Sequence, residues 1–218
     1  MHPVLIAVIA ITVIISLAGF QNVSVFEKYK FNVSAIKYKK EYIRLLSAGF
    51  LHADWGHLFF NMFTLYFFGP IVLEAFNIVG FILIYLGSII LGNLFSLYLY
   101  QKQGWYSAIG ASGGVSGILF AAIAVYPMIG IGILFIPIPI KGYVFGLLYF
   151  SYSVYMMLNP KPHDNIGHAA HLGGAAFGLV YAVATEPEVA FSNIYFLGVM
   201  SLPLLYMAYQ VFVKKRIG

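Results

Sequence analysis

Long stretches of this chain contain no charged residue, and that feature constrains its fold more than any other. Between Lys102 and Lys141 there is no Lys, Arg, Asp or Glu, and residues 3–20 are equally uncharged. Apolar residues make up 61% of the chain and charged residues 9%, against roughly 45–50% and 25% in soluble domains. A soluble domain of 218 residues cannot bury that much apolar surface. The sequence therefore predicts an all-α, polytopic membrane protein.

The apolar runs predict seven membrane spans. A helix needs about 20 apolar residues to cross the hydrocarbon core, and the first run is expected to be retained rather than removed as a signal peptide. Residues 21–54 are too polar to span and predict an interfacial loop with some helix, while Ile-Pro-Ile-Pro at 136–139 predicts a connector. The division expected is a six-span unit over 1–185, with an extra span and basic tail over 186–218. The expected spans are 3–20, 55–76, 78–100, 112–126, 142–158, 167–185 and 190–213.

Composition also excludes several functions. The chain has no cysteine, so disulfides and thiolate chemistry are excluded. Its net charge of +5 is spread over loops and a short tail, which indicates membrane topology and contact with anionic lipid rather than nucleic-acid binding. A His-Glu-x-x-His metal motif is missing from the sequence. We therefore expect neither a metal nor another cofactor.

The most informative span begins at Ser112, in the stretch Gly-Ala-Ser-Gly-Gly at 110–114. The span over 112–126 has only 15 residues, about 22 Å at the helical rise, whereas the hydrocarbon core is about 30 Å thick. Residues 105–111 before it are uncharged and suit a non-helical approach. Non-helical backbone is tolerated at membrane depth only against protein or a water-filled cavity. Ser112 is therefore predicted to lie below the membrane surface, at a helix N-terminus that faces a cavity.

Polar residues on two other spans are predicted to meet this serine. The second, fourth and sixth spans enter the membrane from the same face, because each crossing reverses the direction of the chain. His57 and Asn61 lie in the first turns of the second span, and His168 and His171 lie in the first turns of the sixth. Glycines at intervals of four on the fourth and sixth spans allow close helix packing. These polar groups are expected to converge at similar depth.

Such a cluster has the groups that nucleophilic catalysis needs. A serine hydroxyl requires a base within hydrogen-bond reach, and either His171 or His168 satisfies the spacing. A tetrahedral intermediate requires hydrogen-bond donors for its oxygen, for which the Asn61 amide, His57 and the Ser112 backbone N–H are candidates. Since no acidic residue is placed to complete a triad, we expect a Ser–His dyad.

Four sequence motifs resemble those of the rhomboid family of intramembrane serine proteases. They are Gly-Ala-Ser-Gly at 110–113, Ala-His-Leu-Gly-Gly at 170–174, His52-x4-His57-x3-Asn61, and Phe68-Gly69 followed by Glu74. The resemblance implies that Ser112 is the nucleophile and that His171, rather than His168, is the general base. It further implies an oxyanion site made by His57, Asn61 and the Ser112 backbone, with Gly110 shaping the loop.

The resemblance also carries expectations about the whole protein. It implies a six-helix catalytic bundle over 1–185, transmembrane-protein substrates that approach beside the span at 142–158, and a 159–166 loop that caps the site. The chain is expected to be a multi-pass protein of the cell membrane, in contact with lipid. Two positions differ from the family pattern: Ile43 precedes Arg44 where the family has a Trp-Arg pair, and Ser116 stands where an aromatic residue usually stacks on the base.

Two other functions and the orientation stay open at this point. A catalytically inactive relative would bind membrane clients without cleaving them, and a transporter or channel would use the polar residues to line a path. With seven spans, Lys141 alone of the 12 Lys and Arg residues lies opposite the serine, so the positive-inside rule predicts a cytoplasmic active site. The family resemblance implies an exterior one, which is the orientation we favour.

Overall fold

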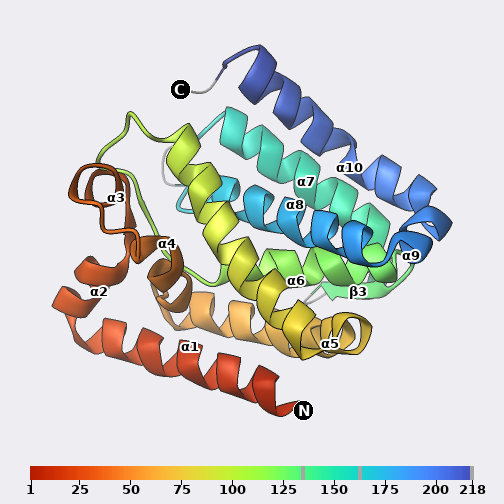
Figure 1. Cartoon of the computed structure of the whole chain (residues 1–218), viewed down its shortest axis with the longest axis horizontal. Helices are drawn as coiled ribbons and strands as arrows, with labels where there is room; N and C mark the ends of the chain where they lie inside the picture. Colours follow the sequence, from red (N-terminus) through yellow and green to blue (C-terminus); the bar gives the residue numbers. More distant parts are fainter. Residues whose placement is uncertain (134–135, 162–163, 217–218) are drawn as a thin grey trace.

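The chain folds into a helical bundle (Figure 1). The structure is a computed structural model, and it describes residues 1–133, 136–161 and 164–216. The predicted all-α, multi-pass fold is confirmed. The helices are α1 (Pro3–Gln21), α2 (Val23–Tyr29), α3 (Val33–Lys39), α4 (Arg44–Ser47), α5 (Trp55–Leu99), α6 (Ser112–Val125), α7 (Gly142–Leu158), α8 (His168–Thr185), α9 (Pro187–Ser192) and α10 (Ile194–Ala208), with a 3-10 turn η1 (Ala48–Phe50) and a π-helical turn η2 (Tyr209–Val213). The strands are β1 (Phe31–Asn32), β2 (Ser107–Ala108), β3 (Gly130–Ile133) and β4 (Ile136–Lys141).

The α5 segment consists of two helices that meet at Asn77. This residue has φ 54° and ψ −172°, which breaks the helix, and an asparagine tolerates positive φ better than most residues. Its side-chain oxygen accepts hydrogen bonds from the backbone N–H of Val79 at 2.8 Å and of Gly80 at 3.4 Å. The same side chain therefore ends one helix and caps the next. The two halves agree with the predicted spans 55–76 and 78–100.

Short helices fill the polar segment between α1 and α5, as predicted. Arg44 is buried and holds this segment together. Its Nε donates to the Glu41 carboxylate at 2.6 Å, and its Nη1 donates to the carbonyl oxygens of Glu27 at 2.8 Å and Lys30 at 2.7 Å. A buried guanidinium is stable only when it is paired with such acceptors. Arg44 therefore anchors this loop although Ile43, rather than a tryptophan, precedes it.

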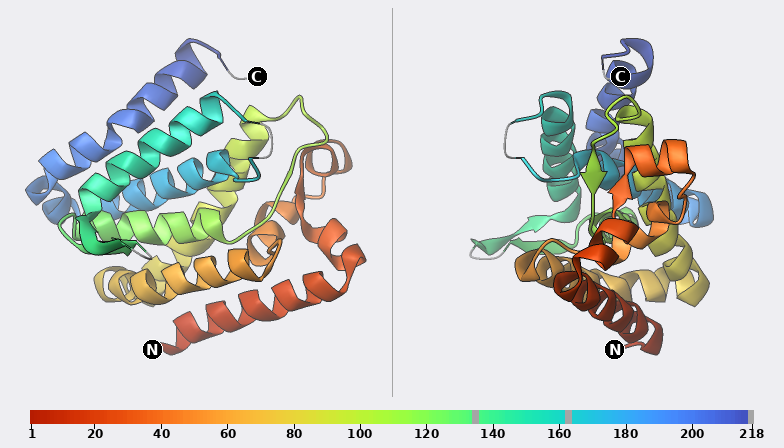
Figure 2. Two further views of the ribbon diagram at one scale, coloured as in Figure 1. Left: turned by 180° about the vertical axis from the view of Figure 1, so that it is seen from behind. Right: turned by 90° about the vertical axis from the view of Figure 1, so that its left-hand side faces the viewer.

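Helices α6, α8 and the second half of α5 form the centre of the bundle (Figure 2). Every residue of α6 from Gly113 to Ala124 is buried. A Cβ atom on Gly174 would collide with the Gly113 carbonyl oxygen, and one on Gly178 would collide with the Gly117 carbonyl oxygen. The predicted small-residue spacing therefore brings the backbones of α6 and α8 into direct contact.

The connector after α6 contains a β-hairpin, which was not predicted from the sequence. Strands β3 and β4 pair antiparallel, with Gly130 opposite Lys141 and Ile131 opposite Ile140. Pro137 and Pro139 cannot donate to a strand ladder, but a two-stranded hairpin leaves each strand one free edge. The prolines that exclude a helix here are thus compatible with an extended strand.

The C-terminal region contains the predicted seventh apolar helix, with an interruption. Helix α9 ends before Asn193, whose side-chain amide donates to the Val125 carbonyl oxygen at 3.3 Å. From Ile194 to Val213 the helix is long and apolar enough to cross a membrane, as are α1 and α5. It packs along α7, where the Met200 sulfur covers Gly146. The separation of 186–218 from the rest remains a prediction, and residues 217 and 218 lie outside the described part.

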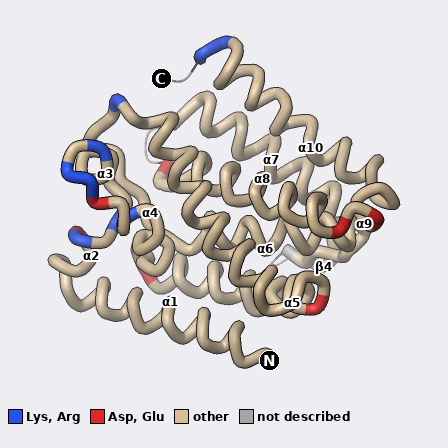
Figure 3. Tube along the Cα trace, viewed as in Figure 1, with Lys and Arg blue, Asp and Glu red and all other residues tan. Residues whose placement is uncertain are grey.

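Charged residues collect at the two ends of the bundle (Figure 3). Blue Lys and Arg segments gather around α3 and α4 and near the C-terminus, whereas red Asp and Glu segments lie at α9 and beside the α5 label. The surface between these ends is apolar, as a lipid-facing surface must be. The basic end is also the end at which α6 and α8 begin.

Candidate active site

Ser112 is the first residue of α6 and follows an extended approach, as predicted. Strand β2 pairs with β1, which ties the approach to the segment before α5. Closer to the serine, the Gly110 N–H donates to the Ala48 carbonyl oxygen at 2.9 Å, and the Ala111 carbonyl accepts the first α6 hydrogen bond at 2.9 Å. The first N–H groups of a helix have no partner within the helix. The Ser112 N–H is therefore left for a partner outside α6.

His171 lies beside this serine. Its Nε2 is 2.6 Å from Ser112 Oγ, a distance that indicates a strong hydrogen bond. His171 stands in the first turn of α8, and the backbone contact between Gly113 and Gly174 brings the two helix starts together. In the tautomer with its hydrogen on Nδ1, the ring accepts the Ser112 hydroxyl hydrogen at Nε2. The arrangement has the geometry of a nucleophile and its base.

His168, the other candidate on α8, faces a different partner. It is buried, and its Nε2 lies 3.1 Å from the Asp164 carboxylate. The edge of its ring packs against Tyr152 at 5.5 Å between ring centroids. The spacing in the sequence left both histidines open, and the structure places only His171 next to Ser112. Because Asp164 contacts His168 and not His171, Ser112 and His171 form a pair rather than a triad.

A cavity of about 420 Å³ opens at the dyad. Its polar lining includes Ser112, His171, His57 and Asn61, and apolar side chains of α5, α6 and α7 form part of its walls. The Asn61 amide donates one hydrogen to the His57 carbonyl oxygen at 2.9 Å, which fixes its orientation and leaves the second amide hydrogen free to bind a ligand. The cavity therefore brings a serine hydroxyl, an imidazole ring and side-chain hydrogen-bond donors together.

Gly110 allows the His57 ring to approach the serine loop. Its φ is +120°, a conformation that is open only to glycine. A Cβ atom at this position would lie 2.7 Å from both Cε1 and Nε2 of His57. Both the backbone angle and the contact require glycine at this position.

Tyr149 of α7 packs on the His171 ring, a contact that was not predicted from the sequence. Its ring is nearly parallel to the His171 ring, with 6.4 Å between centroids and an interplanar angle of 21°. Its hydroxyl forms a hydrogen bond with Ser116 Oγ at 2.8 Å. Ser116 is the position at which the resembling family usually has an aromatic residue, so here a neighbouring helix provides the ring. The signal available in the sequence was Ser116 itself, since its hydroxyl can form a hydrogen bond with a tyrosine hydroxyl from another helix.

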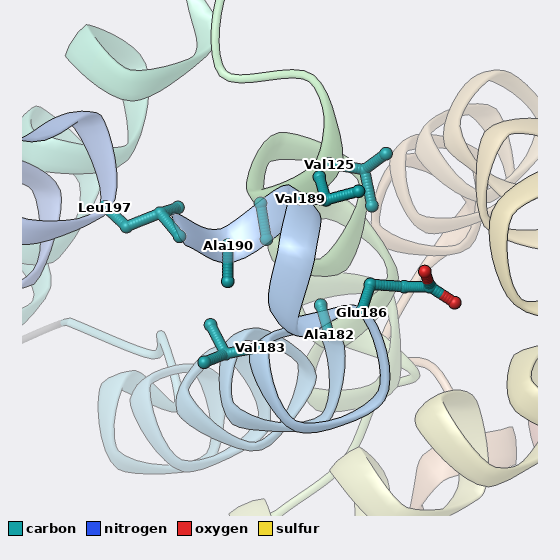
Figure 4. A pocket seen from close by; sticks show the side chains of 8 residues that line it. Val125, Ala182, Val183, Glu186, Val189, Ala190 and Leu197 are labelled. Carbon is teal, nitrogen blue, oxygen red and sulfur yellow. The ribbon is translucent and has the colours of Figure 1, made fainter. Parts of the chain in front are cut away.

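A second depression lies at the far ends of α6 and α8 and has no comparable chemistry (Figure 4). Its lining is apolar except for Glu186, whose carboxylate points away from the other labelled side chains. A site for catalysis needs convergent polar groups. The cavity at Ser112 is the candidate active site. The lining residues of the depression are Ala124, Val125, Ala182, Val183, Glu186, Val189, Ala190 and Leu197.

Comparison with known proteins gives a family and several relatives. The Rhomboid domain profile matches residues 39–187, more than half of the chain. Rhomboid protein 1, mitochondrial, from Saccharomyces cerevisiae is 29% identical over 143 residues, which cover 64% of this chain and 40% of the yeast protein. The Homo sapiens Presenilin-associated rhomboid-like protein, mitochondrial, is 29% identical over 140 residues, or 63% of this chain and 36% of the human protein.

A plant relative is similar to the same extent. The Arabidopsis thaliana Rhomboid-like protein 11, chloroplastic, is 30% identical over 152 residues, which cover 63% of this chain and 50% of the plant protein. The chain thus spans half or less of the length of these three relatives.

Proposed function

This chain belongs to the rhomboid family, which includes intramembrane serine proteases, and from that premise we propose that it hydrolyses peptide bonds in or near transmembrane helices of other membrane proteins. The observation that carries the proposal is the 2.6 Å contact between Ser112 Oγ and His171 Nε2. A hydroxyl bonded to a neutral imidazole at the mouth of a cavity is suited to acyl transfer. The proposed catalytic groups are Ser112 and His171, with Asn61, His57 and Gly110 at the oxyanion site.

The first half of the reaction forms an ester on the enzyme. Ser112 Oγ attacks the carbonyl carbon of the scissile peptide while its proton passes to His171 Nε2. The tetrahedral intermediate then expels the amine, which takes that proton from His171. The C–N bond is broken, the carbonyl carbon is bound to Oγ, and the base is neutral again.

The second half releases the ester. A water molecule gives a proton to His171 Nε2 and attacks the same carbon. Collapse of this intermediate breaks the bond to Oγ, and the proton returns to Ser112 from His171. The reaction needs no metal or other cofactor, since hydroxyl, imidazole and water supply every atom and proton.

The negative oxygen of both intermediates needs hydrogen-bond donors that are already in place. The free N–H of Ser112 at the start of α6, the second Asn61 amide hydrogen and the His57 ring are the donors we propose. The positive end of the α6 dipole adds to their effect. Asn61 is held by its bond to the His57 carbonyl, so its amide does not have to reorganise during the reaction.

The surroundings of the cavity suit a membrane-protein substrate. Phe145 and Tyr149 of α7 and Leu119 of α6 form apolar walls beside the dyad, and we propose that a substrate helix approaches along α7. A peptide bond is reached only when its helix unwinds, so helices with small or helix-breaking residues are the expected substrates. The polar ends of the bundle contact lipid headgroups, and the membrane we propose is the cell membrane, which fractionation of expressing cells tests.

The test is cleavage of a reporter transmembrane protein by the purified chain in detergent. Wild type is compared with Ser112→Ala and with Ser153→Ala, which removes a buried serine hydroxyl that does not line the cavity. We expect Ser112→Ala to abolish cleavage and Ser153→Ala to retain it, with both variants folded by thermal unfolding. Cleavage by Ser112→Ala would overturn the mechanism. A folded wild type that binds the reporter without cutting it would replace the proposal with client binding.

A further inference from the structure

His52 is a buried histidine that the proposed reaction does not use. It lies between η1 and α5, outside the spanning helices, and its side chain has 0% exposure. It does not line the cavity at the dyad. Burying an imidazole costs free energy unless its polar atoms are paired. The partners of His52 therefore indicate what the residue does.

Three hydrogen bonds form a relay through this ring. The Ser16 hydroxyl on α1 lies 2.9 Å from the Phe50 carbonyl oxygen and 2.8 Å from His52 Nδ1. On the other side of the ring, the Ala111 N–H lies 3.3 Å from Nε2. Ser16 is also fully buried. The relay thus runs from the first helix of the chain to the residue before the nucleophile.

The directions of these bonds fix the state of His52. The Ser16 hydroxyl has a single hydrogen, and the Phe50 carbonyl can only accept it. The Ser16 oxygen must therefore accept a hydrogen from Nδ1, and this leaves the Nε2 lone pair to accept the Ala111 N–H. The opposite tautomer would point its Nε2–H at the Ala111 N–H, two donors against each other.

The electrostatic surroundings favour the same neutral ring. Burial, together with the neighbouring His57, lowers the pKa of His52 to about 3, against a smaller opposite effect of the Asp54 carboxylate. The edge of the His52 ring also packs on His57, with 4.8 Å between centroids. His52 therefore touches both the loop before Ser112 and a proposed oxyanion donor.

From these contacts we propose that His52, oriented by Ser16 of α1, is a positioning residue that holds the nucleophile loop through the Ala111 N–H. This inference rests on the proposed protease function. The Gly110 and Ala111 amides are the last two before Ser112, and both are fixed, one by Ala48 and the other by His52. Their fixed direction sets where the Ser112 N–H points. Ser16 lies outside residues 39–187, so this requirement extends beyond the part matched by the family profile.

The first experiment removes the Ser16 hydroxyl and compares it with a matched control. Thr12 lies one turn earlier on α1, is equally buried, and its hydroxyl donates to the Val8 carbonyl oxygen of its own helix at 2.8 Å. We expect Ser16→Ala to lower kcat by on the order of 10–100-fold, by analogy with the loss of residues that orient metal ligands, with KM little changed. Thr12→Val should keep kcat. Equal kcat in the two variants would overturn the proposal.

The second experiment ranks two replacements of His52. A glutamine amide reaches the position of Nε2 and can accept the Ala111 N–H, whereas an asparagine amide reaches only the position of Nδ1. We therefore expect His52→Gln to retain more kcat than His52→Asn at similar thermal stability. If His52 had a purely structural role, the kcat of each variant would depend only on how well its side chain fills the space and keeps the protein stable. A ranking of kcat that tracks the melting temperature alone would therefore contradict the relay.

A third measurement separates failure of this inference from failure of the protease function. The 15N NMR signals of the His52 ring in detergent report its tautomer whether or not the chain cleaves anything. We expect the hydrogen on Nδ1 in wild type and in Thr12→Val, and a changed Nδ1 signal in Ser16→Ala, where that N–H loses its acceptor. A wild-type ring with its hydrogen on Nε2 would sink the relay, while absence of Ser112-dependent cleavage would count against the protease function alone.

Discussion

At the level of single residues, the two histidines at the start of α8 have different neighbours and should differ in function. His171 contacts Ser112 Oγ at 2.6 Å, whereas His168 contacts Asp164 at 3.1 Å. We predict that His171→Ala abolishes cleavage, since no other base reaches the serine among the described residues, and that His168→Ala leaves most of it. Initial rates on the reporter substrate measure both. Equal loss in the two variants would remove His171 from its role as the single base.

Asn61 is the side chain whose contribution to the oxyanion site is most readily measured. Asn61→Ala should lower kcat by on the order of 10²-fold if the amide is one of the oxyanion donors. Asn93→Ala is the matched control, because Asn93 is also a buried asparagine of α5 but donates to the Leu45 carbonyl at 2.8 Å. The control should lower the melting temperature without a comparable loss of kcat. An unchanged kcat in Asn61→Ala would exclude its amide from the site.

At the level of helices, Tyr149 connects α7 to the base on α8. Tyr149→Ala should lower kcat by roughly 2- to 10-fold, the effect expected from a lost aromatic contact of about 0.5–1.5 kcal/mol. Tyr149→Phe keeps the ring and loses only the bond to Ser116, so it should retain most of the rate. The double variant Ser116→Tyr with Tyr149→Ala should recover activity by returning a ring from α6. If Phe and Ala replacements lose the same activity, the hydroxyl rather than the ring positions His171.

Substitutions in the contact between α6 and α8 should affect the stability of the protein more than they affect any single step of catalysis. A Cβ atom on Gly178 would collide with the Gly117 carbonyl oxygen, and overpacking of this kind costs about 1–3 kcal/mol. We predict a lower melting temperature for Gly178→Ala in detergent. Gly198→Ala on α10 is the control, because a Cβ atom there would meet no described atom within 4 Å. A melting temperature for Gly178→Ala equal to that of this control would show that the helices have room to separate.

At the level of the whole molecule, the order and direction of the spans were predictable from hydropathy alone. Uncharged runs predict where the helices are, and the reversal at each crossing places Ser112, His57 and His171 at one face. The polar segment before α5 and the short α6 followed from the same reasoning. These features depend on one-dimensional properties of the chain, namely the length, charge and spacing of its residues.

Features that depend on contacts between distant helices were not predictable in the same way. No periodicity in α7 distinguishes Tyr149 from its other aromatic residues, and nothing local relates Ser16 on α1 to Ala111 near α6. The hairpin of β3 and β4 was missed because a short apolar segment with two prolines excludes a helix without indicating a strand. In each case the deciding information is which surfaces meet after folding.

The orientation of the bundle is a prediction for the whole molecule. The basic tail lies at the same end of the bundle as α3 (Figure 3), so the positive-inside rule still opposes the exterior active site that we predict from the family resemblance. The chain has no cysteine, which makes single-cysteine labelling clean. With an impermeant maleimide on intact cells, Gln101→Cys should react and Gly132→Cys should react only after permeabilisation. The reverse pattern would place the active site in the cytoplasm.

The complete burial of α6 has a consequence for how the surrounding lipid can influence this protein. From Gly113 to Ala124 the helix that begins with Ser112 has protein on every side, so acyl chains do not solvate it. Changes in bilayer thickness or fluidity reach the serine only through the outer helices. Rates measured across vesicles of increasing chain length would then report how α7 and its neighbours adapt to the membrane, while the hydrogen bond between serine and imidazole keeps the same length.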